Sequence, residues 1–386
     1  MSLELSRRHE WVMQSEIRNM SIECEKLGGI NLSQGVCDVE MPDPVRRGAH
    51  LAIDEGVNSY TRYDGIDELR LAIARKHERF TGQNVDPEGE IVVSAGATGA
   101  LYCACLALLN PGDEVIVFEP YYGYHVSTLL ATQAVPVYVR MNPPGWTFDG
   151  SALEKIVTGR TRGIIVCTPA NPSGKIFSRG ELEMISACAA KHDLFVFTDE
   201  IYEHFIYDDA KHISPSTLQG MRERTITISG LSKTFSITGW RIGYCISSAQ
   251  WSQAIGYFND LIYVCAPAPL QMGVACGLSE LSADYYEKIS KEYKGKRDMI
   301  CSALKKAGLK PYTPQGAYYV LADVARLPGK TSKERAMYLL HATGVACVPG
   351  EAFYHDGAGD QLARFCFAKD DFVLHQACQR LEKLKI

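Results

Sequence analysis

The sequence predicts an α/β fold: a large domain with a mostly parallel sheet covered by helices on both faces, plus a smaller α+β domain. Between residues 91 and 259, short runs rich in Val and Ile alternate with helical segments. Such near-continuous apolar runs are typical of parallel strands that are buried on both faces. From residue 284 the pattern changes to a long charged helix, followed by short strands mixed with helices.

The elements follow from apolar periodicity and from the turn residues that interrupt it. Residues 7–27 are predicted as one helix, and 66–80 as an amphipathic helix that ends at Thr81-Gly82. The predicted strands of the large domain are 91–94, 114–119, 135–140, 163–168, 194–199, 225–229 and 241–246, and its further helices are 96–109, 120–132, 151–158, 178–192 and 249–259. We therefore expect a large domain over 45–283 and a small domain formed by 1–44 with 284–386.

Composition narrows the function. The chain has 386 residues and a formal net charge of -5, which gives no electrostatic reason to expect nucleic acid or a membrane surface as a partner. Its 13 cysteines are scattered, with no C-x-x-C pair, and its 10 histidines form no zinc signature, so we expect core thiols and no metal site. No signal peptide or membrane-spanning run is visible, and we expect a cytoplasmic protein.

Candidate site residues stand directly after the predicted strands. In open α/β sheets, ligands bind beyond the carboxyl ends of the strands. The residues found there are Gly96 to Gly99, Tyr122, Asn171, Asp199 with Tyr202, and Lys233. Each alone has an ordinary explanation: a tight turn, a packed ring, an Asn-Pro turn, a helix N-cap or a solvated lysine. The glycine turn is neither a Walker loop nor a dinucleotide motif. Together, these residues predict one ligand-binding crevice.

Four of these segments carry a family resemblance when they are taken in order. They are the Gly96 loop, TPANPSG (168–174), TDEIYE (198–203) and SGLSKTFSITGWRIG (229–243), the last being the most specific. With them the chain closely resembles the class I and II aminotransferases over essentially its whole length. Further landmarks in the right order are LSQGV (32–36), SYTRYDG (59–65), TPQGAYYVL (313–321) and ARFCFA (363–368). The resemblance implies an aspartate aminotransferase-like fold and pyridoxal 5'-phosphate as cofactor.

The resemblance also implies roles around the cofactor ring. Lys233 would hold the cofactor as a Schiff base and then act as general base and acid. Asp199 would keep the pyridine nitrogen protonated, while Asn171 and Tyr202 would hydrogen-bond the phenolic oxygen. Tyr122 would stack on the ring. His125 either orients Asp199 from behind or is a plain structural histidine.

For the phosphate, the resemblance implies the backbone of Ala97 and Thr98, a serine hydroxyl and the fork of Arg241. The chain departs from many relatives here, because Gly230 stands where they carry serine. We assign Ser232 to the phosphate, with Ser229 as the alternative hydroxyl.

For the substrate and the partner subunit, three more positions match. Arg364 would clamp the substrate α-carboxylate, assisted by Asn171, and the backbone of Gly35 would close over it; the alternative for Arg364 is a surface arginine at a sheet edge. Tyr60 matches a tyrosine that reaches the partner subunit's phosphate, which implies a homodimer with shared active sites.

The function expected from the resemblance is transfer of the amino group of an L-amino acid to a 2-oxo acid. A C-S lyase of the same fold, acting by β-elimination, is the alternative, because both reactions begin in the same way. A non-enzymatic regulator fused to a DNA-binding domain fits neither the extent of the match nor the acidic charge. At positions where relatives bind a distal carboxylate, this chain has Thr98 and Ile262 or Tyr263 instead of a cation. This favours neutral, apolar or aromatic amino acids as substrates. Glutamate would serve as an amino donor only if an arginine rearranged to accommodate it.

Overall fold

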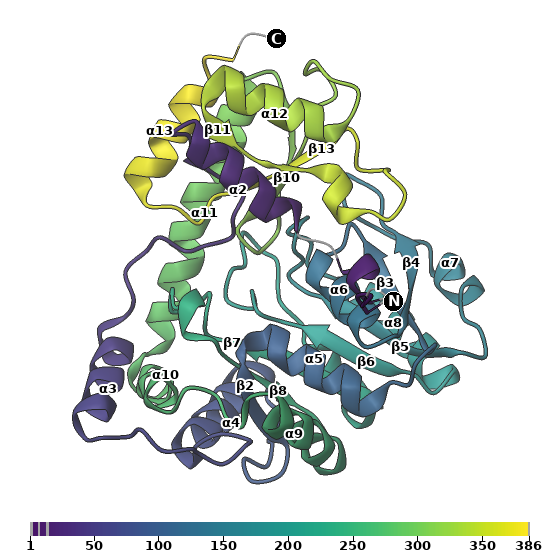
Figure 1. Ribbon diagram of the computed structural model, residues 1–386, viewed down its shortest axis with the longest axis vertical. Coiled ribbons are helices and arrows are strands. Elements are labelled where there is room, and N and C mark those ends of the chain that lie inside the picture. Colours follow the sequence, from purple (N-terminus) through teal and green to yellow (C-terminus); the bar gives the residue numbers. More distant parts are fainter. Residues whose placement is uncertain (1–2, 7, 13–14, 385–386) are drawn as a thin grey trace.

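The computed structural model describes residues 3–6, 8–12 and 15–384, and its centre is a seven-stranded sheet (Figure 1). The strand order is β2-β8-β7-β6-β5-β3-β4. The strands are β2 (Ile91–Ala95), β3 (Glu114–Glu119), β4 (Val135–Arg140), β5 (Thr161–Cys167), β6 (Phe195–Asp199), β7 (Thr225–Gly230) and β8 (Ile242–Ile246). Only β8 runs against both of its neighbours, whereas the pairs from β7 to β4 are parallel. The predicted α/β class with a mostly parallel sheet is confirmed.

Helices cover both faces of this sheet because side chains alternate along each buried strand. From β3, Ile116 and Phe118 pack in one core with residues of α8 (Arg179–Lys191). The next residues, Val115 and Val117, belong to the opposite core with α5 (Gly96–Leu108) and α9 (Ala249–Tyr263). The other helices around the sheet are α3 (Asp43–Asp54), α4 (Asp67–Thr81), α6 (Gly123–Ala131), α7 (Gly150–Lys155) and α10 (Ala268–Glu280).

A second, smaller sheet of order β12-β13-β10-β9 lies in the upper part of Figure 1. Its strands β9 (Lys310–Tyr312), β10 (Tyr319–Asp323), β12 (Val348–Pro349) and β13 (Leu362–Cys366) are antiparallel. The helices of this part are α12 (Ser332–Thr343) and α13 (Asp371–Leu381), and α11 (Ala283–Lys306) extends up to it from the large sheet's side.

The N-terminal segment joins this smaller part of the fold. Strand β1 (Ile30–Asn31) pairs in parallel with β11 (Val345–Ala346). Met20 and Cys24 are buried in the same apolar core as Phe365. These contacts support the predicted division into 45–283 and 1–44 with 284–386, which we keep as a proposal.

The N-terminus departs from the prediction of one helix over 7–27. Residues 7, 13 and 14 lie outside the described residues, and the rest forms α1 (Arg8–Trp11) and α2 (Glu16–Lys26). The cause is Ser15, whose extended backbone and side-chain hydrogen bond to the Ile17 N–H make it the N-cap of α2. Helices α3 and α10 were not predicted, and both begin next to a proline, which sequence reasoning takes for a loop.

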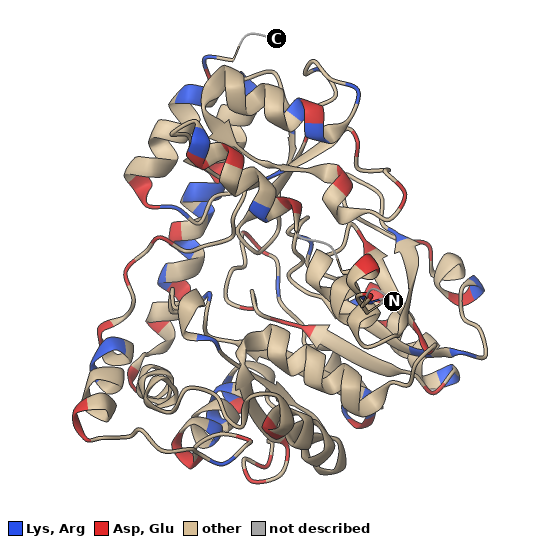
Figure 2. Cartoon of the chain, in the orientation of Figure 1, with Lys and Arg blue, Asp and Glu red and all other residues tan. Residues whose placement is uncertain are grey.

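Residues of both charges are interspersed along the outer helices in Figure 2. The 13 cysteines are all free thiols, most of them buried, as expected. Among the described residues, no helix is both long enough and apolar enough to cross a bilayer.

Candidate active site

A cavity of about 680 Å³ lies beyond the carboxyl ends of the parallel strands. It brings together eleven of the twelve predicted site residues: Gly35, Ala97, Thr98, Tyr122, Asn171, Asp199, Tyr202, Ser232, Lys233, Arg241 and Arg364. The twelfth, Tyr60, is not part of this lining, and its side chain is 83% exposed. The site therefore forms from segments of both sheets and of the N-terminal region.

Lys233 lies three residues beyond the end of β7 and points into the cavity. Its Nζ donates a hydrogen bond of 3.3 Å to the backbone oxygen of Gly35. Burial lowers the pKa of the Lys233 ammonium. A lysine amine with a lowered pKa is a better nucleophile and proton carrier near neutral pH than an exposed one.

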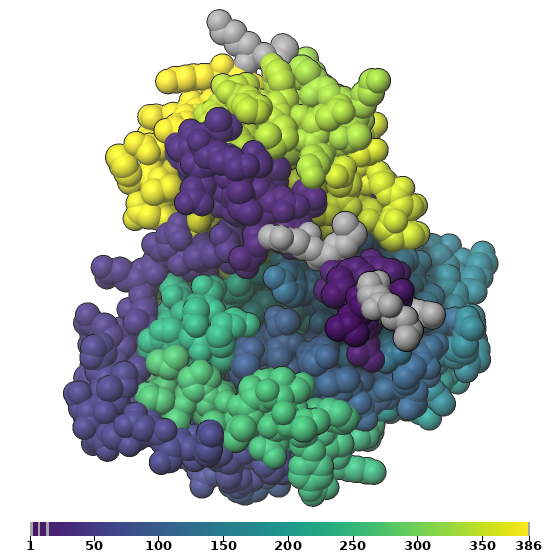
Figure 3. All heavy atoms as spheres, viewed as in Figure 1, coloured from purple at the N-terminus to yellow at the C-terminus, as the bar shows by residue number. Residues whose placement is uncertain are grey.

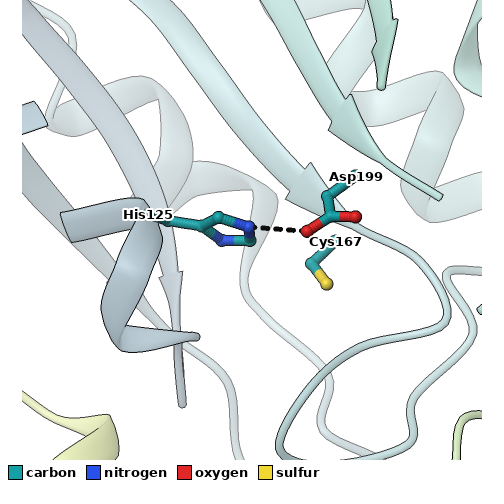
Figure 4. Close-up of side chains that lie close together, drawn as sticks. All are labelled: His125, Cys167 and Asp199. Atoms are coloured by element: carbon teal, nitrogen blue, oxygen red, sulfur yellow. Dashed lines mark hydrogen bonds and ion pairs between the residues drawn. The ribbon is translucent and has the colours of Figure 1, made fainter. Parts of the chain in front are cut away.

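Asp199 ends β6, and its carboxylate is held from behind by a histidine (Figure 4). Nε2 of His125, in the first turn of α6, lies 2.8 Å from Oδ2 of Asp199. The contact supports the orienting role for His125 over the plain structural one. Cys167, which ends β5, lies beside this pair. A ring nitrogen of His125, the Sγ of Cys167 and a carboxylate oxygen of Asp199 all lie within 4.8 Å of one another. Burial raises the pKa of the Cys167 thiol, which keeps it neutral.

An anion cradle forms where α5 begins. The free N–H groups of its first turn lie at Ala97 and Thr98, and the Arg241 guanidinium lies directly against Gly96. A Cβ on Gly96 would come within 2.4 Å of Nη2 of Arg241, and a Cβ on Gly243 within 2.3 Å of the Ala97 nitrogen. At Gly243 the clash is with backbone, and Gly96 has a φ of +76°, so glycine is favoured at both positions. Helix N-terminal amides next to an arginine fork are a typical phosphate site.

Arg364 comes from β13, an inner strand of the small sheet, and its side chain is fully buried. Nη1 donates to Oδ1 of Asn171 at 2.7 Å, and Nη2 to the backbone oxygen of Ser33 at 2.6 Å. Among the residues that the structure describes, no carboxylate pairs with Arg364, and its buried Nε has no hydrogen-bond partner. The alternative of a surface arginine at a sheet edge is wrong, because this position is central and buried.

Comparison with known proteins identifies the family. The family described as aminotransferase class I and II matches residues 28–381. The chain is 35% identical to a probable N-succinyldiaminopimelate aminotransferase of Mycobacterium tuberculosis, covering 95% of this chain and 94% of that protein. It is 32% identical to the methionine aminotransferase of Escherichia coli, over 95% and 94% of the two chains. The chain belongs to the class I and II aminotransferases.

Solved structures agree with this assignment. The N-succinyldiaminopimelate aminotransferase of M. tuberculosis superimposes with a TM-score of 0.95 at 34% identity, covering 99% of this chain and all of that one. The structure of Thermus thermophilus aspartate aminotransferase with maleate superimposes with a TM-score of 0.92 at 31% identity, covering the whole of both chains. The protein is thus a pyridoxal-phosphate-dependent aminotransferase with the aspartate aminotransferase fold.

The residues present in the aminotransferase fit this cofactor. The cradle at Gly96 suits a phosphate, the oriented Asp199 carboxylate suits a protonated ring nitrogen, and Lys233 supplies a buried amine. Burial raises the pKa of Tyr202 well above its ordinary value, so its phenol remains a donor for a ring oxygen.

The structure also separates the two candidate serines of the aminotransferase. Ser232 lines the cavity. Ser229 lies elsewhere: it is buried, and its Oγ donates to Oε1 of Glu203 at 2.8 Å. Of the two serines, Ser232 is therefore the one that lines the cavity.

A buried ion pair lies next to the site. Nζ of Lys76, from α4, is 2.5 Å from Oε1 of Glu203 and 2.9 Å from the hydroxyl of Tyr244 on β8. Burial raises the pKa of the Glu203 carboxyl, but nearby charges, chiefly Lys76, outweigh burial and lower this pKa to about 2. Glu203 immediately follows Tyr202, so the pair anchors the turn that carries Asp199 and Tyr202.

Two features of the site were missed in the sequence. The hydroxyls of Tyr319 and Tyr202 are hydrogen-bonded at 3.0 Å. Tyr319 also lies so close to Gly35 that a Cβ added to Gly35 would be 1.8 Å from the Tyr319 hydroxyl. The segment 313–321 is one of the landmarks of the family resemblance, but nothing in its sequence distinguishes Tyr319 from Tyr318. The second feature is α2, which contributes side chains to the cavity wall, including Arg18 and Glu25. Its charged surface is that of an ordinary exposed helix, so no sequence signal marks it.

Proposed function

We propose that this aminotransferase moves the amino group of an L-amino acid to a 2-oxo acid, with the cofactor bound covalently to Lys233. The observation that carries the proposal is Arg364. A buried guanidinium without an acidic partner in the described chain is costly, and a substrate α-carboxylate would neutralise it. It lines the same cavity as the Lys233 amine.

Each cofactor group has matching residues. Pyridoxal phosphate, when bound, supplies an electron sink for the charge that develops at the substrate Cα. Asp199, oriented by His125, would keep the ring nitrogen protonated, while Asn171 and Tyr202 would contact the ring oxygen. The cradle of Ala97, Thr98, Ser232 and Arg241 would hold the phosphate, and Tyr122 would cover the ring face.

Lys233 would move the proton. Its Nζ lies in the cavity near Gly35, and its lowered pKa increases the fraction of neutral amine at neutral pH. A neutral amine can accept the Cα proton and return it as an ammonium. Gly35 is the residue that permits this arrangement, because Tyr319 occupies the space of any larger side chain.

We propose neutral, apolar or aromatic amino donors. The cavity wall includes Ile17, Ile22, Val36 and Tyr124. Thr98 lines the cavity without a charge, whereas Ile262 and Tyr263 are absent from its lining. Relatives named for methionine and for kynurenine, the latter from Dictyostelium discoideum at 33% identity, agree with such donors.

We also propose a homodimer with shared active sites. The exposed Tyr60 cannot serve the cavity of its own chain as it stands. Nearby, the Tyr63 ring contacts Tyr257 of α9, and Leu261, one turn further along α9, is 79% exposed. An exposed apolar patch of this kind favours a second copy of the chain as its cover.

Borohydride reduction tests the proposal. The holoenzyme should be yellow and lose its colour on reduction, leaving a pyridoxyl group on Lys233 in the peptide map. Lys233→Ala should carry no label, whereas Lys76→Met, which removes another buried lysine, should still be labelled at Lys233. A label on any other lysine would refute the assignment.

Product analysis separates transfer from β-elimination. An aminotransferase needs a 2-oxo acid acceptor to turn over, whereas a C-S lyase releases ammonia and pyruvate from cystathionine with no acceptor present. We expect turnover of methionine or phenylalanine only with an acceptor. Acceptor-independent ammonia release at a comparable rate would point to the lyase instead.

A further inference from the structure

Helix α2 presents two different faces to the fold. Met20 and Cys24 are buried in the core of the small domain. Arg18, Ile22 and Glu25 line the cavity, at the spacing that places residues on one helix face. In Figure 3, the purple N-terminal segment lies between the yellow-green C-terminal part and the blue part of the large domain. The cavity side of α2 thus carries one cation and one anion.

These two charges are the only ones in the described cavity lining to which the proposed chemistry gives no task. Lys233, Arg364 and Asp199 each make a hydrogen bond within the site and match a cofactor or substrate group. Arg241 lies in the phosphate cradle. Over residues 3–6, 8–12 and 15–384, no side-chain hydrogen bond or ion pair involves Arg18 or Glu25. By contrast, Lys26 on the same helix pairs with Glu23 at 2.8 Å.

We propose that Arg18 is a specificity residue that binds the distal carboxylate of a dicarboxylic co-substrate, while Arg364 holds its α-carboxylate. This inference rests on the proposed function. A guanidinium fork matches a carboxylate, and a molecule with two carboxylates needs two separate cations. Of the cations that line the described cavity, Arg18 is the one left for the second carboxylate.

The exposure of Arg18 explains how one cavity takes two kinds of substrate. Amino transfer occurs in two half-reactions, so a neutral donor and its acceptor occupy the same cavity in turn. A buried cation would be left unpaired whenever the neutral side chain is present, which is costly. Arg18 is exposed and on a long flexible side chain, so it remains hydrated with a neutral donor and engages only a distal carboxylate.

Glu25 provides a matched contrast on the same face. It lies seven residues further along α2, which is roughly 10 Å of helix. Its negative charge repels a carboxylate, so its removal should leave dicarboxylate binding unchanged or improve it. A change on this helix face therefore lowers dicarboxylate efficiency only if it removes the Arg18 cation.

The experiment compares Arg18→Gln with Glu25→Gln and with Lys26→Gln, which removes an exposed cation outside the cavity lining. Single-turnover rates of the holoenzyme are measured with 2-oxoglutarate and glutamate, and with pyruvate and phenylalanine as neutral probes. For Arg18→Gln we expect kcat/KM for the dicarboxylates to fall roughly tenfold. This loss lies between the effects of removing an exposed and a buried charged contact. The kcat/KM for the neutral probes should change by less than about twofold. The other two variants should show no such loss.

Salt supplies a second measurement. The Arg18 contact is partly exposed, so added salt should lower the wild-type efficiency for dicarboxylates and hardly affect Arg18→Gln. Equal losses for both probe classes in Arg18→Gln, or the same loss in Lys26→Gln, would overturn the inference and leave the proposed function intact. If the wild type transfers nothing from either probe class, the proposed function itself fails.

Discussion

Lys76→Met tests the buried pair that anchors the Asp199–Tyr202 turn. The substitution keeps most of the side-chain volume but removes the cation 2.5 Å from Glu203. The Glu203 carboxylate then remains buried, with Ser229 as its hydrogen-bond donor. Leaving one member of a buried pair uncompensated costs about 3 to 5 kcal/mol.

The pKa of Glu203 gives a similar magnitude. Its carboxyl pKa lies at about 2 in the folded protein, against an ordinary value of 4.5. A shift of this size corresponds to about 3 kcal/mol of stability. For a depressed carboxyl pKa, this stability is present above pH 4.5 and is lost as the pH falls toward 2.

The assay is thermal unfolding at fixed protein and cofactor concentrations. A 386-residue chain that unfolds as one unit has an unfolding entropy of about 0.8 kcal/mol per kelvin, so we expect Tm to fall by about 4 to 6 °C at pH 7. At lower pH, protonation of the unpaired Glu203 should relieve part of this loss of stability, so the difference in Tm between Lys76→Met and the wild type should become smaller.

Two further variants serve as controls. Lys26→Met breaks the exposed pair with Glu23 and should change stability by less than about 1 kcal/mol. The double variant Lys76→Met/Glu203→Gln removes both charges and should regain much of the loss. A Tm shift for Lys76→Met as small as that of Lys26→Met, or a gap that is independent of pH, would refute the argument.

Three other predictions concern the site itself. Asp199→Asn should retain cofactor absorbance but lose activity by roughly 10² to 10³; near-normal turnover would mean that another residue holds the ring nitrogen. Arg364→Ala should lower kcat/KM for amino acids by at least roughly 10² while sparing amines that lack the carboxylate, and equal losses for both would contradict its role. Tyr60→Phe and Lys233→Ala, each impaired alone, should recover part of the activity when their subunits are exchanged, because one hybrid site carries neither lesion. No recovery after verified exchange would show that Tyr60 serves its own subunit.

Much of the fold and site was predictable because parallel strands carry a strong local signal. Buried Val and Ile runs mark the strands, and the residues directly after them meet at one edge of the sheet. Asp199, Asn171 and Lys233 could therefore be assigned to one crevice from the sequence alone. The family resemblance added Arg364, which lies on the other sheet and has no such local signal.

What the sequence did not show depends on contacts between distant segments. The choice between Ser229 and Ser232 was open, because only the position of Glu203 reveals that Ser229 has a partner elsewhere. Asp199 is a candidate helix N-cap by sequence, yet turns follow it, because backbone hydrogen bonds tie the segment to β7 and to the small domain. In the sequence, nothing distinguishes Arg18 from any charged residue of a surface helix; only the position of α2 against the cavity does so.

The pairing of β1 with β11 has a consequence for the order in which the chain is made. Ile30 pairs with Val345, so the ribosome must add roughly 300 residues, over about 15 to 60 s, before β1 meets its partner. The cradle at Gly96 needs nothing later than β8, whereas Arg364 is translated near the end. A nascent chain can thus assemble its own residues of the proposed phosphate site well before its proposed carboxylate clamp exists.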